Sequence, residues 1–183
     1  MKRAFLIHGW QGKPFQGFRP WLKKQLEENG FLVEIPEMPD PDNPKTDEWI
    51  SRMKETIGKP DENCFLLGHS LGSVAILRYL EELNSGKIGG AVLVAGFTDD
   101  LEISDLSDFF RTPIDWDKIK SHCSKFVAIN SDNDPYVDMK YGYEFEKKLD
   151  AKLIIEEGKG HFSDAEGTLE LSSALKAMLE MSA

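Results

Sequence analysis

Short apolar segments alternate with longer amphipathic segments along most of the chain. Six mostly apolar segments have the length of a buried strand: 4–7, 31–35, 64–67, 91–95, 126–129 and 152–155. Between them, apolar residues recur at helical spacing in 18–28, 46–57, 71–83, 138–149 and 164–181. The strand segments are nearly continuous in hydrophobicity, which is typical of strands buried on both faces. The pattern therefore predicts an α/β fold with three α/β/α layers, a doubly wound, mostly parallel six-stranded sheet carrying helices on both faces.

Two segments interrupt this alternation. The first, 36–44, is rich in proline and is expected to be a surface loop. The second, 96–124, is a long connection with an acidic first half and several aromatic residues. Connections of this length are often lids or binding loops, so Phe97, Phe109 and Trp116 are candidates for an apolar substrate pocket. The alternative interpretation is one or two surface helices held in place by buried side chains.

Length and composition favour one domain spanning residues 1–183. No apolar stretch reaches the length of about 18 residues that a membrane span needs, and no signal peptide precedes the first strand, so we expect a cytoplasmic protein. The net charge of −10 argues against nucleic acid and anionic membranes as partners. Because the two cysteines and four histidines lack the spacing of metal ligands, we expect neither a metal ion nor another cofactor.

The chemistry begins with the pattern Gly68-His69-Ser70-Leu71-Gly72, which lies between a predicted strand and a predicted helix. In this setting G-x-S-x-G forms a nucleophile elbow, a turn so sharp that residues two positions from the serine must lack side chains. The Ser70 hydroxyl would then be free of the strand end. The Leu71 amide, at the start of the helix, would donate a hydrogen bond to a developing oxyanion.

A serine nucleophile requires a base, and the base requires an acid that orients it. In doubly wound hydrolases these follow the serine in the order acid, then histidine, each after a strand. The turn after the fifth predicted strand contains Asp132 and Asp134, and a glycine-flanked His161 follows the sixth. We favour Asp134 as the acid because Asp132 follows the strand closely and could bond the turn backbone instead. His161 is the predicted base.

The second oxyanion donor is expected in the loop after the first strand, and the Trp10 amide is the most suitable candidate. The other three histidines are not candidates for the base. His8 precedes the serine in the chain and is expected to bond backbone near the elbow. His69 is expected to point away from the reacting groups, and His122 to lie on the surface.

These motifs make the chain resemble a compact α/β-hydrolase without a separate cap domain. In particular, it resembles the small serine hydrolases grouped with retinoblastoma-binding protein 9 and the bacillary YdeN proteins. The resemblance extends over nearly the whole length and includes His8-Gly9-Trp10, the elbow, 132–137, and Gly160-His161-Phe162. It implies a triad of Ser70, Asp134 and His161, with oxyanion donors at Trp10 and Leu71. Asp138 stands where many hydrolases have proline, and the retinoblastoma-binding motif L-x-C-x-E is absent, so that partner is not implied.

The sequence thus predicts a carboxylesterase-like serine hydrolase that cleaves a small carboxylic ester, or a related acyl bond, through an acyl-enzyme. Its expected partner is a small-molecule acyl substrate, with neither nucleic acid nor membrane. Thioesters, amides and lactones stay open as substrates, because the same triad serves them all. A rival of a different class is a protein-binding module that has kept the hydrolase fold with weak turnover or none.

Overall fold

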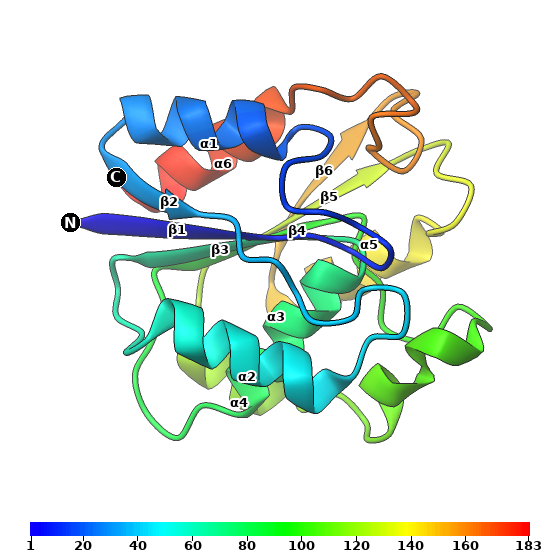
Figure 1. The fold of residues 1–183 in the computed structure, drawn as a ribbon, viewed down its shortest axis with the longest axis horizontal. Coiled ribbons are helices and arrows are strands. Elements are labelled where there is room, and N and C mark those ends of the chain that lie inside the picture. The colour runs from blue at the N-terminus through cyan, green and yellow to red at the C-terminus, as the bar shows by residue number, and fades with distance from the viewer.

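Six parallel strands form one sheet at the centre of the computed structural model, which describes residues 1–183 (Figure 1). The strand order is β2-β1-β3-β4-β5-β6, and each neighbouring pair is parallel. The chain starts in β1, forms the neighbouring edge strand β2, returns past β1 to β3 and then proceeds to the other edge. The strands are β1 Lys2–Ile7, β2 Phe31–Glu34, β3 Cys64–His69, β4 Gly90–Val94, β5 Phe126–Ser131 and β6 Lys152–Glu156. The predicted doubly wound sheet is confirmed, and it is parallel throughout.

Helices cover both faces of this sheet, giving three layers. One face carries α1 and α6, which lie side by side in Figure 1, and the other carries α2, α3, α4 and α5. The helices are α1 Arg19–Glu28, α2 Thr46–Ile57, α3 Leu71–Glu81, α4 Trp116–His122, α5 Lys140–Leu149 and α6 Ser172–Met181, with a 3₁₀ helix η1 at Ser104–Phe110. None of these helices has both the length and the apolar character that crossing a bilayer requires.

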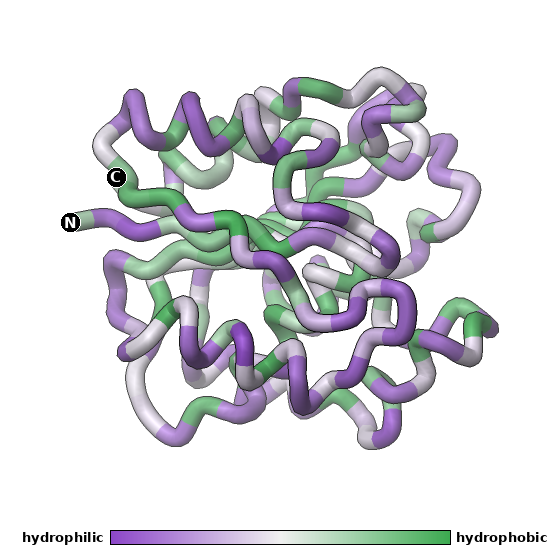
Figure 2. The backbone as a smooth tube through the Cα atoms, in the orientation of Figure 1, coloured by the Kyte–Doolittle hydropathy of each residue, from purple (hydrophilic) through white to green (hydrophobic).

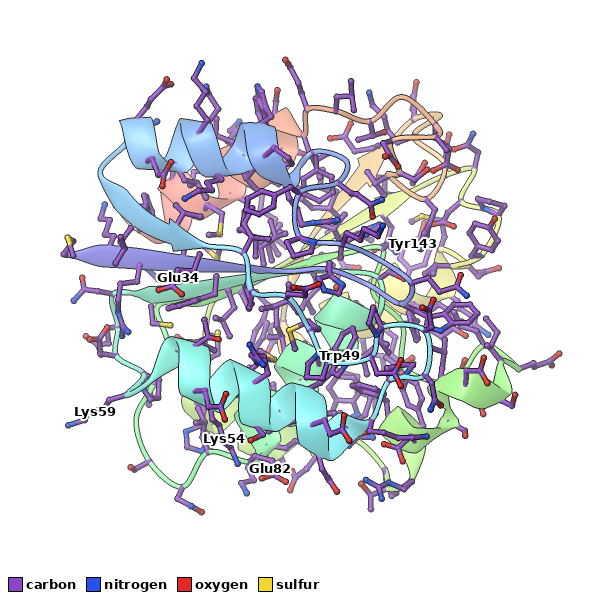
Figure 3. All side chains as sticks on the ribbon, in the orientation of Figure 1. Glu34, Trp49, Lys54, Lys59, Glu82 and Tyr143 are labelled. Carbon is purple, nitrogen blue, oxygen red and sulfur yellow. The ribbon has the colours of Figure 1, made fainter.

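The hydrophobic residues concentrate where the layers meet. Figure 2 shows hydrophobic strands at the centre and hydrophilic segments along the outer helices and loops. Two buried clusters result, one on each side of the sheet, and the larger lies under α2, α3, α4 and α5. The outer surface is held by ion pairs such as Lys54 with Glu82, which Figure 3 shows beside each other, at 2.8 Å. Both faces of the central strands β3, β4 and β5 are thus buried, as their continuous apolar runs predicted, whereas the edge strands β2 and β6 keep exposed residues such as Leu32 and Ile155.

The helix predicted over 164–181 is shorter in the structure. Residues 164–167 form a turn, 168–171 have no regular structure, and α6 begins only at Ser172. Gly167 has a φ of +80°, outside the helical region, and Thr168 is buried beside the loop that precedes α1. This segment packs against another loop, and that contact, rather than the helical spacing of its apolar residues, determines its conformation.

The long connection 96–124 contains two short helices with buried anchors. Phe109 of η1 and Ile119 of α4 are buried in the larger cluster. Arg78 of α3 fixes this connection: Nε donates to the Phe109 carbonyl at 2.7 Å and Nη2 to the Thr112 carbonyl at 2.7 Å. The sequence permits two interpretations of this segment, either a lid or binding loop or surface helices held by buried side chains. The structure agrees with the second interpretation.

Candidate active site

Ser70 occupies a strained turn between β3 and α3. Its φ is +55° and ψ is −123°, a conformation that residues with side chains rarely adopt. Gly68 and Gly72 make the turn possible. A Cβ atom on Gly68 would lie 2.4 Å from the Gly72 backbone, and one on Gly72 would lie 2.4 Å from the Ile7 carbonyl oxygen. The predicted need for glycine at both positions is therefore a consequence of backbone packing.

The structure brings together Ser70, Asp134 and His161 from three separate loops. The Ser70 hydroxyl donates to His161 Nε2 at 3.0 Å, and His161 Nδ1–H donates to Asp134 Oδ2 at 2.8 Å. The Asp134 side chain is 1% exposed, and its other oxygen accepts from the amides of Tyr136 and Val137 at 2.9 and 3.0 Å. These bonds fix the position and orientation of the carboxylate. They also favour the imidazole tautomer with its proton on Nδ1, which leaves Nε2 free to accept the serine proton.

Asp132, the alternative acid, binds a backbone amide of the neighbouring loop. Its Oδ1 accepts from the Gly158 amide at 2.8 Å. The side chains on either side continue the pattern, since Ser131 Oγ accepts from the Lys159 amide and Asn133 Oδ1 from the Gly160 amide. Three consecutive side chains, from the last residue of β5 onwards, thus bind three consecutive amides after β6. This holds the loop of Asp134 against the loop of His161.

Two residues that the sequence did not indicate hold His161 itself. Glu166 Oε2 accepts from the His161 amide at 2.8 Å and from the Ser163 amide at 3.1 Å. Partial desolvation acts to raise the pKa of Glu166, but these hydrogen bonds outweigh it and lower the pKa. Tyr136 packs edge-on against the His161 ring, with 5.3 Å between ring centroids. No periodicity or spacing marks either residue, because both contacts join segments that meet only in the folded chain.

His69 does not point away from the reacting groups as predicted. Its Nε2–H donates to the His161 carbonyl at 2.7 Å, and the two rings lie 5.0 Å apart. Burial, with the nearby His161 and Arg19 adding repulsion, holds the pKa of His69 well below its usual range. His69, the neighbour of Ser70, therefore holds the backbone of His161. The prediction failed because a sharp turn exposes both faces of the strand end, not only the face of Ser70.

His8 and His122 bond backbone groups. His8 is buried, donates from Nδ1 to the Gly9 carbonyl at 2.9 Å and accepts from the Met38 amide at 3.0 Å, and burial lowers its pKa. It thereby joins the loop after β1 to the proline-rich loop. His122, at the end of α4, contacts the Gly86 carbonyl at 2.7 Å.

Two backbone amides beside Ser70 have no acceptor in the protein. They belong to Trp10 and Leu71, the predicted oxyanion donors. Leu71 is the first residue of α3, so its amide lies outside the helical hydrogen-bond ladder. The loop of Trp10 is in contact with the nucleophile, since a Cβ on Gly9 would lie 2.9 Å from Ser70 Cβ. Both amides are thus available close to the serine.

A cavity of about 190 Å³ opens at Ser70 and is lined by His161, His69 and Trp10, among others. Phe97, Phe109 and Trp116 do not line it, so the predicted apolar pocket is wrong. Phe97 and Phe109 are fully buried, and Phe109 packs on Trp49 with ring centroids 5.6 Å apart. Trp116 packs on Phe145 at 6.4 Å. These aromatic side chains anchor η1 and α4 to the core instead of facing a substrate.

Comparison with known proteins agrees with this architecture. A family model described as serine hydrolase matches residues 4–180. The chain is 33% identical to YdeN of Bacillus subtilis (strain 168) over 172 residues, covering 93% of this chain and 90% of YdeN. It is 35% identical to the serine hydrolase RBBP9 of Rattus norvegicus over 175 residues, covering 94% and 87%.

Solved structures show the same arrangement of elements. The structure of the ydeN gene product from B. subtilis superposes with a TM-score of 0.94 at 30% identity, covering 99% of this chain and 98% of that one. Est1E from Butyrivibrio proteoclasticus has a TM-score of 0.76 at 14% identity, covering 98% and 88%, which is a likeness of fold. The compact α/β-hydrolase fold is therefore confirmed, and the chain belongs to the serine hydrolase family.

Proposed function

We propose that this serine hydrolase cleaves a small carboxylic ester or a related acyl bond through an acyl-enzyme on Ser70. The observation that carries the proposal is the continuous hydrogen-bond chain from Asp134 through His161 to Ser70, with bonds of 2.8 and 3.0 Å. A serine hydroxyl is a weak nucleophile at neutral pH unless an adjacent base removes its proton as it attacks. This chain supplies such a base in the required tautomer.

In the first step Ser70 Oγ attacks the carbonyl carbon while its proton moves to His161 Nε2. The imidazolium that forms is stabilised by Asp134, whose buried carboxylate already accepts from Nδ1. Negative charge develops on the carbonyl oxygen. The amides of Trp10 and Leu71 have no other acceptor, and donors fixed in advance stabilise an oxyanion without reorganisation.

Collapse of the tetrahedral intermediate then releases the alcohol, which takes its proton from His161 Nε2. Water enters, His161 removes one of its protons, and the hydroxide adds to the acyl carbon. A second collapse returns the proton to Ser70 and releases the carboxylic acid. Because the cavity is only about 190 Å³, short acyl groups fit it better than long chains.

Steady-state hydrolysis of 4-nitrophenyl acetate, butyrate and octanoate tests the proposal. We expect turnover that falls with chain length. Ser70→Ala and His161→Ala should each lower kcat by about 10⁴- to 10⁶-fold, and Asp134→Asn by about 10⁴-fold, because the three groups act as a unit. Folded protein that turns over none of these esters would favour the rival, a hydrolase fold that serves in binding alone.

A further inference from the structure

Arg19, the first residue of α1, brings a buried positive charge to the cavity that contains Ser70. The residue is 4% exposed, and it lines this cavity together with Ser70 and His161. Its guanidinium donates from Nε to the Pro14 carbonyl at 3.1 Å and from Nη2 to the Lys13 carbonyl at 2.8 Å. These two bonds fix the plane of the group beside the nucleophile.

This cation has no counter-ion in contact. No carboxylate oxygen lies within 4.0 Å of it, although the other buried arginine, Arg78, pairs with Glu81 at 2.7 Å. Asp164, which also lines the cavity, acts on Arg19 only from a longer distance. Burial lowers the pKa of Arg19 to about 10, so the group is still charged at neutral pH. A buried charge without a partner is costly, and the planar guanidinium is suited to bind a carboxylate that would supply one.

The third guanidinium nitrogen of Arg19 is free to bind an anion. Nη1 makes no hydrogen bond in the protein, and it is not among the polar atoms that are fully enclosed without a partner. It therefore keeps some accessible surface, on a residue that lines the cavity. The rest of the lining is polar or glycine apart from Trp10 and Phe162, which suits a polar substrate better than an aliphatic one.

We propose that Arg19 binds a carboxylate carried by the substrate and so selects anionic esters. This inference rests on the proposed esterase activity and adds the class of substrate. A singly charged carboxylate matches one guanidinium. A phosphate dianion would bring twice the charge to one cation with the Asp164 carboxylate nearby, so we favour the carboxylate.

Matched pairs of esters test the inference with the carboxylate on either side of the scissile bond. On the acyl side, mono-4-nitrophenyl glutarate is compared with the neutral 4-nitrophenyl valerate. On the leaving-group side, 4-acetoxybenzoate is compared with its methyl ester. Hydrogen bonds to charged groups contribute enough that wild-type protein should prefer at least one anionic ester by about 10- to 100-fold in kcat/KM.

Variants assign the preference to Arg19. Arg19→Gln should abolish the preference, measured within this variant as the ratio of kcat/KM for the anionic ester to kcat/KM for its neutral partner. Arg19→Lys keeps the charge but loses the planar fork, so it should keep part of the preference. Arg52→Gln, at an exposed position on α2, removes the same charge far from the cavity and should leave the preference intact.

The outcomes separate this inference from the proposed function. If wild-type protein hydrolyses the neutral esters but prefers neither anionic ester, or if the preference survives in Arg19→Gln, the inference is wrong and the esterase stands. If Arg19→Gln does not fold, Arg19→Lys decides: a preference smaller than that of wild type supports the inference, and an undiminished preference overturns it. Failure of all four esters would instead count against the esterase itself.

Discussion

At the scale of single residues, the base is held by its surroundings as much as by the acid. His161 is bound at its amide by Glu166, at its carbonyl by His69 and at its ring by Asp134. The amide and carbonyl contacts fix the backbone from which the imidazole extends. Small displacements of a reacting group lower the rate strongly. Loss of these supporting contacts should therefore change kcat more than it changes substrate binding.

Removing Glu166 tests this. We expect Glu166→Ala to lower kcat by about 10- to 100-fold with little change in KM, because the imidazole would no longer be held at the Ser70 hydroxyl. The matched control is Glu170→Ala, which removes an exposed carboxylate that makes no hydrogen bond or ion pair in the same loop. Equal kcat for the two variants would show that Glu166 has no part in positioning His161.

At the scale of elements, α3 serves two purposes. Its first turn carries the elbow, and its last turn carries Arg78, which binds the carbonyls of Phe109 and Thr112 and the carboxylate of Glu81. One helix therefore fixes both the nucleophile and the long connection 96–124. The connection is anchored by this buried charge as well as by its apolar side chains.

Replacing Arg78 should release that connection. Because Arg78→Ala leaves Glu81 and two buried carbonyls unpaired, we expect the free energy of unfolding to fall by about 3–5 kcal/mol. Amide hydrogen exchange should increase in η1 and α4 before it increases in β3. Arg52→Ala, on the exposed face of α2, is the control and should change stability by less than about 0.5 kcal/mol. Unchanged exchange in residues 104–122 of folded Arg78→Ala would contradict this role.

The elements were predictable from the sequence because burial on both faces leaves a continuous apolar run in the central strands β3, β4 and β5. The meeting of Ser70, Asp134 and His161 was predictable because parallel strands deliver their loops to one edge of the sheet. Other features were not. An aromatic residue such as Phe109 has the same pattern whether it lines a pocket or fills a core. Glu166 and Arg19 act through contacts between loops, which leave no period or spacing in the chain.

At the scale of the whole molecule, two histidines make stability depend on pH. Burial lowers the pKa of His8, and burial lowers that of His69 well below its usual range. Each is therefore protonated more readily in the unfolded chain than in the folded one. Their contribution is present above the unfolded pKa and is lost as the pH falls below it.

Urea unfolding at a series of pH values measures this contribution. From about pH 6.5 downwards, the free energy of unfolding should fall by up to about 1.4 kcal/mol per pH unit for each of the two histidines. His69→Gln removes one titrating group and should make the dependence less steep. A free energy of unfolding that is constant or rises between about pH 6.5 and pH 5 would contradict the assignment of both histidines as neutral in the fold.

The most direct test of the account is covalent labelling by a fluorophosphonate, which reacts with serines activated by a neighbouring base. Intact-protein and peptide mass spectrometry should find one adduct on wild-type protein, located on Ser70. Ser70→Ala should take up none, and His161→Ala should react far more slowly because the hydroxyl loses its base. Folded wild-type protein that stays unlabelled, or that is labelled as readily after Ser70→Ala, would contradict the central claim that Ser70 is an activated nucleophile.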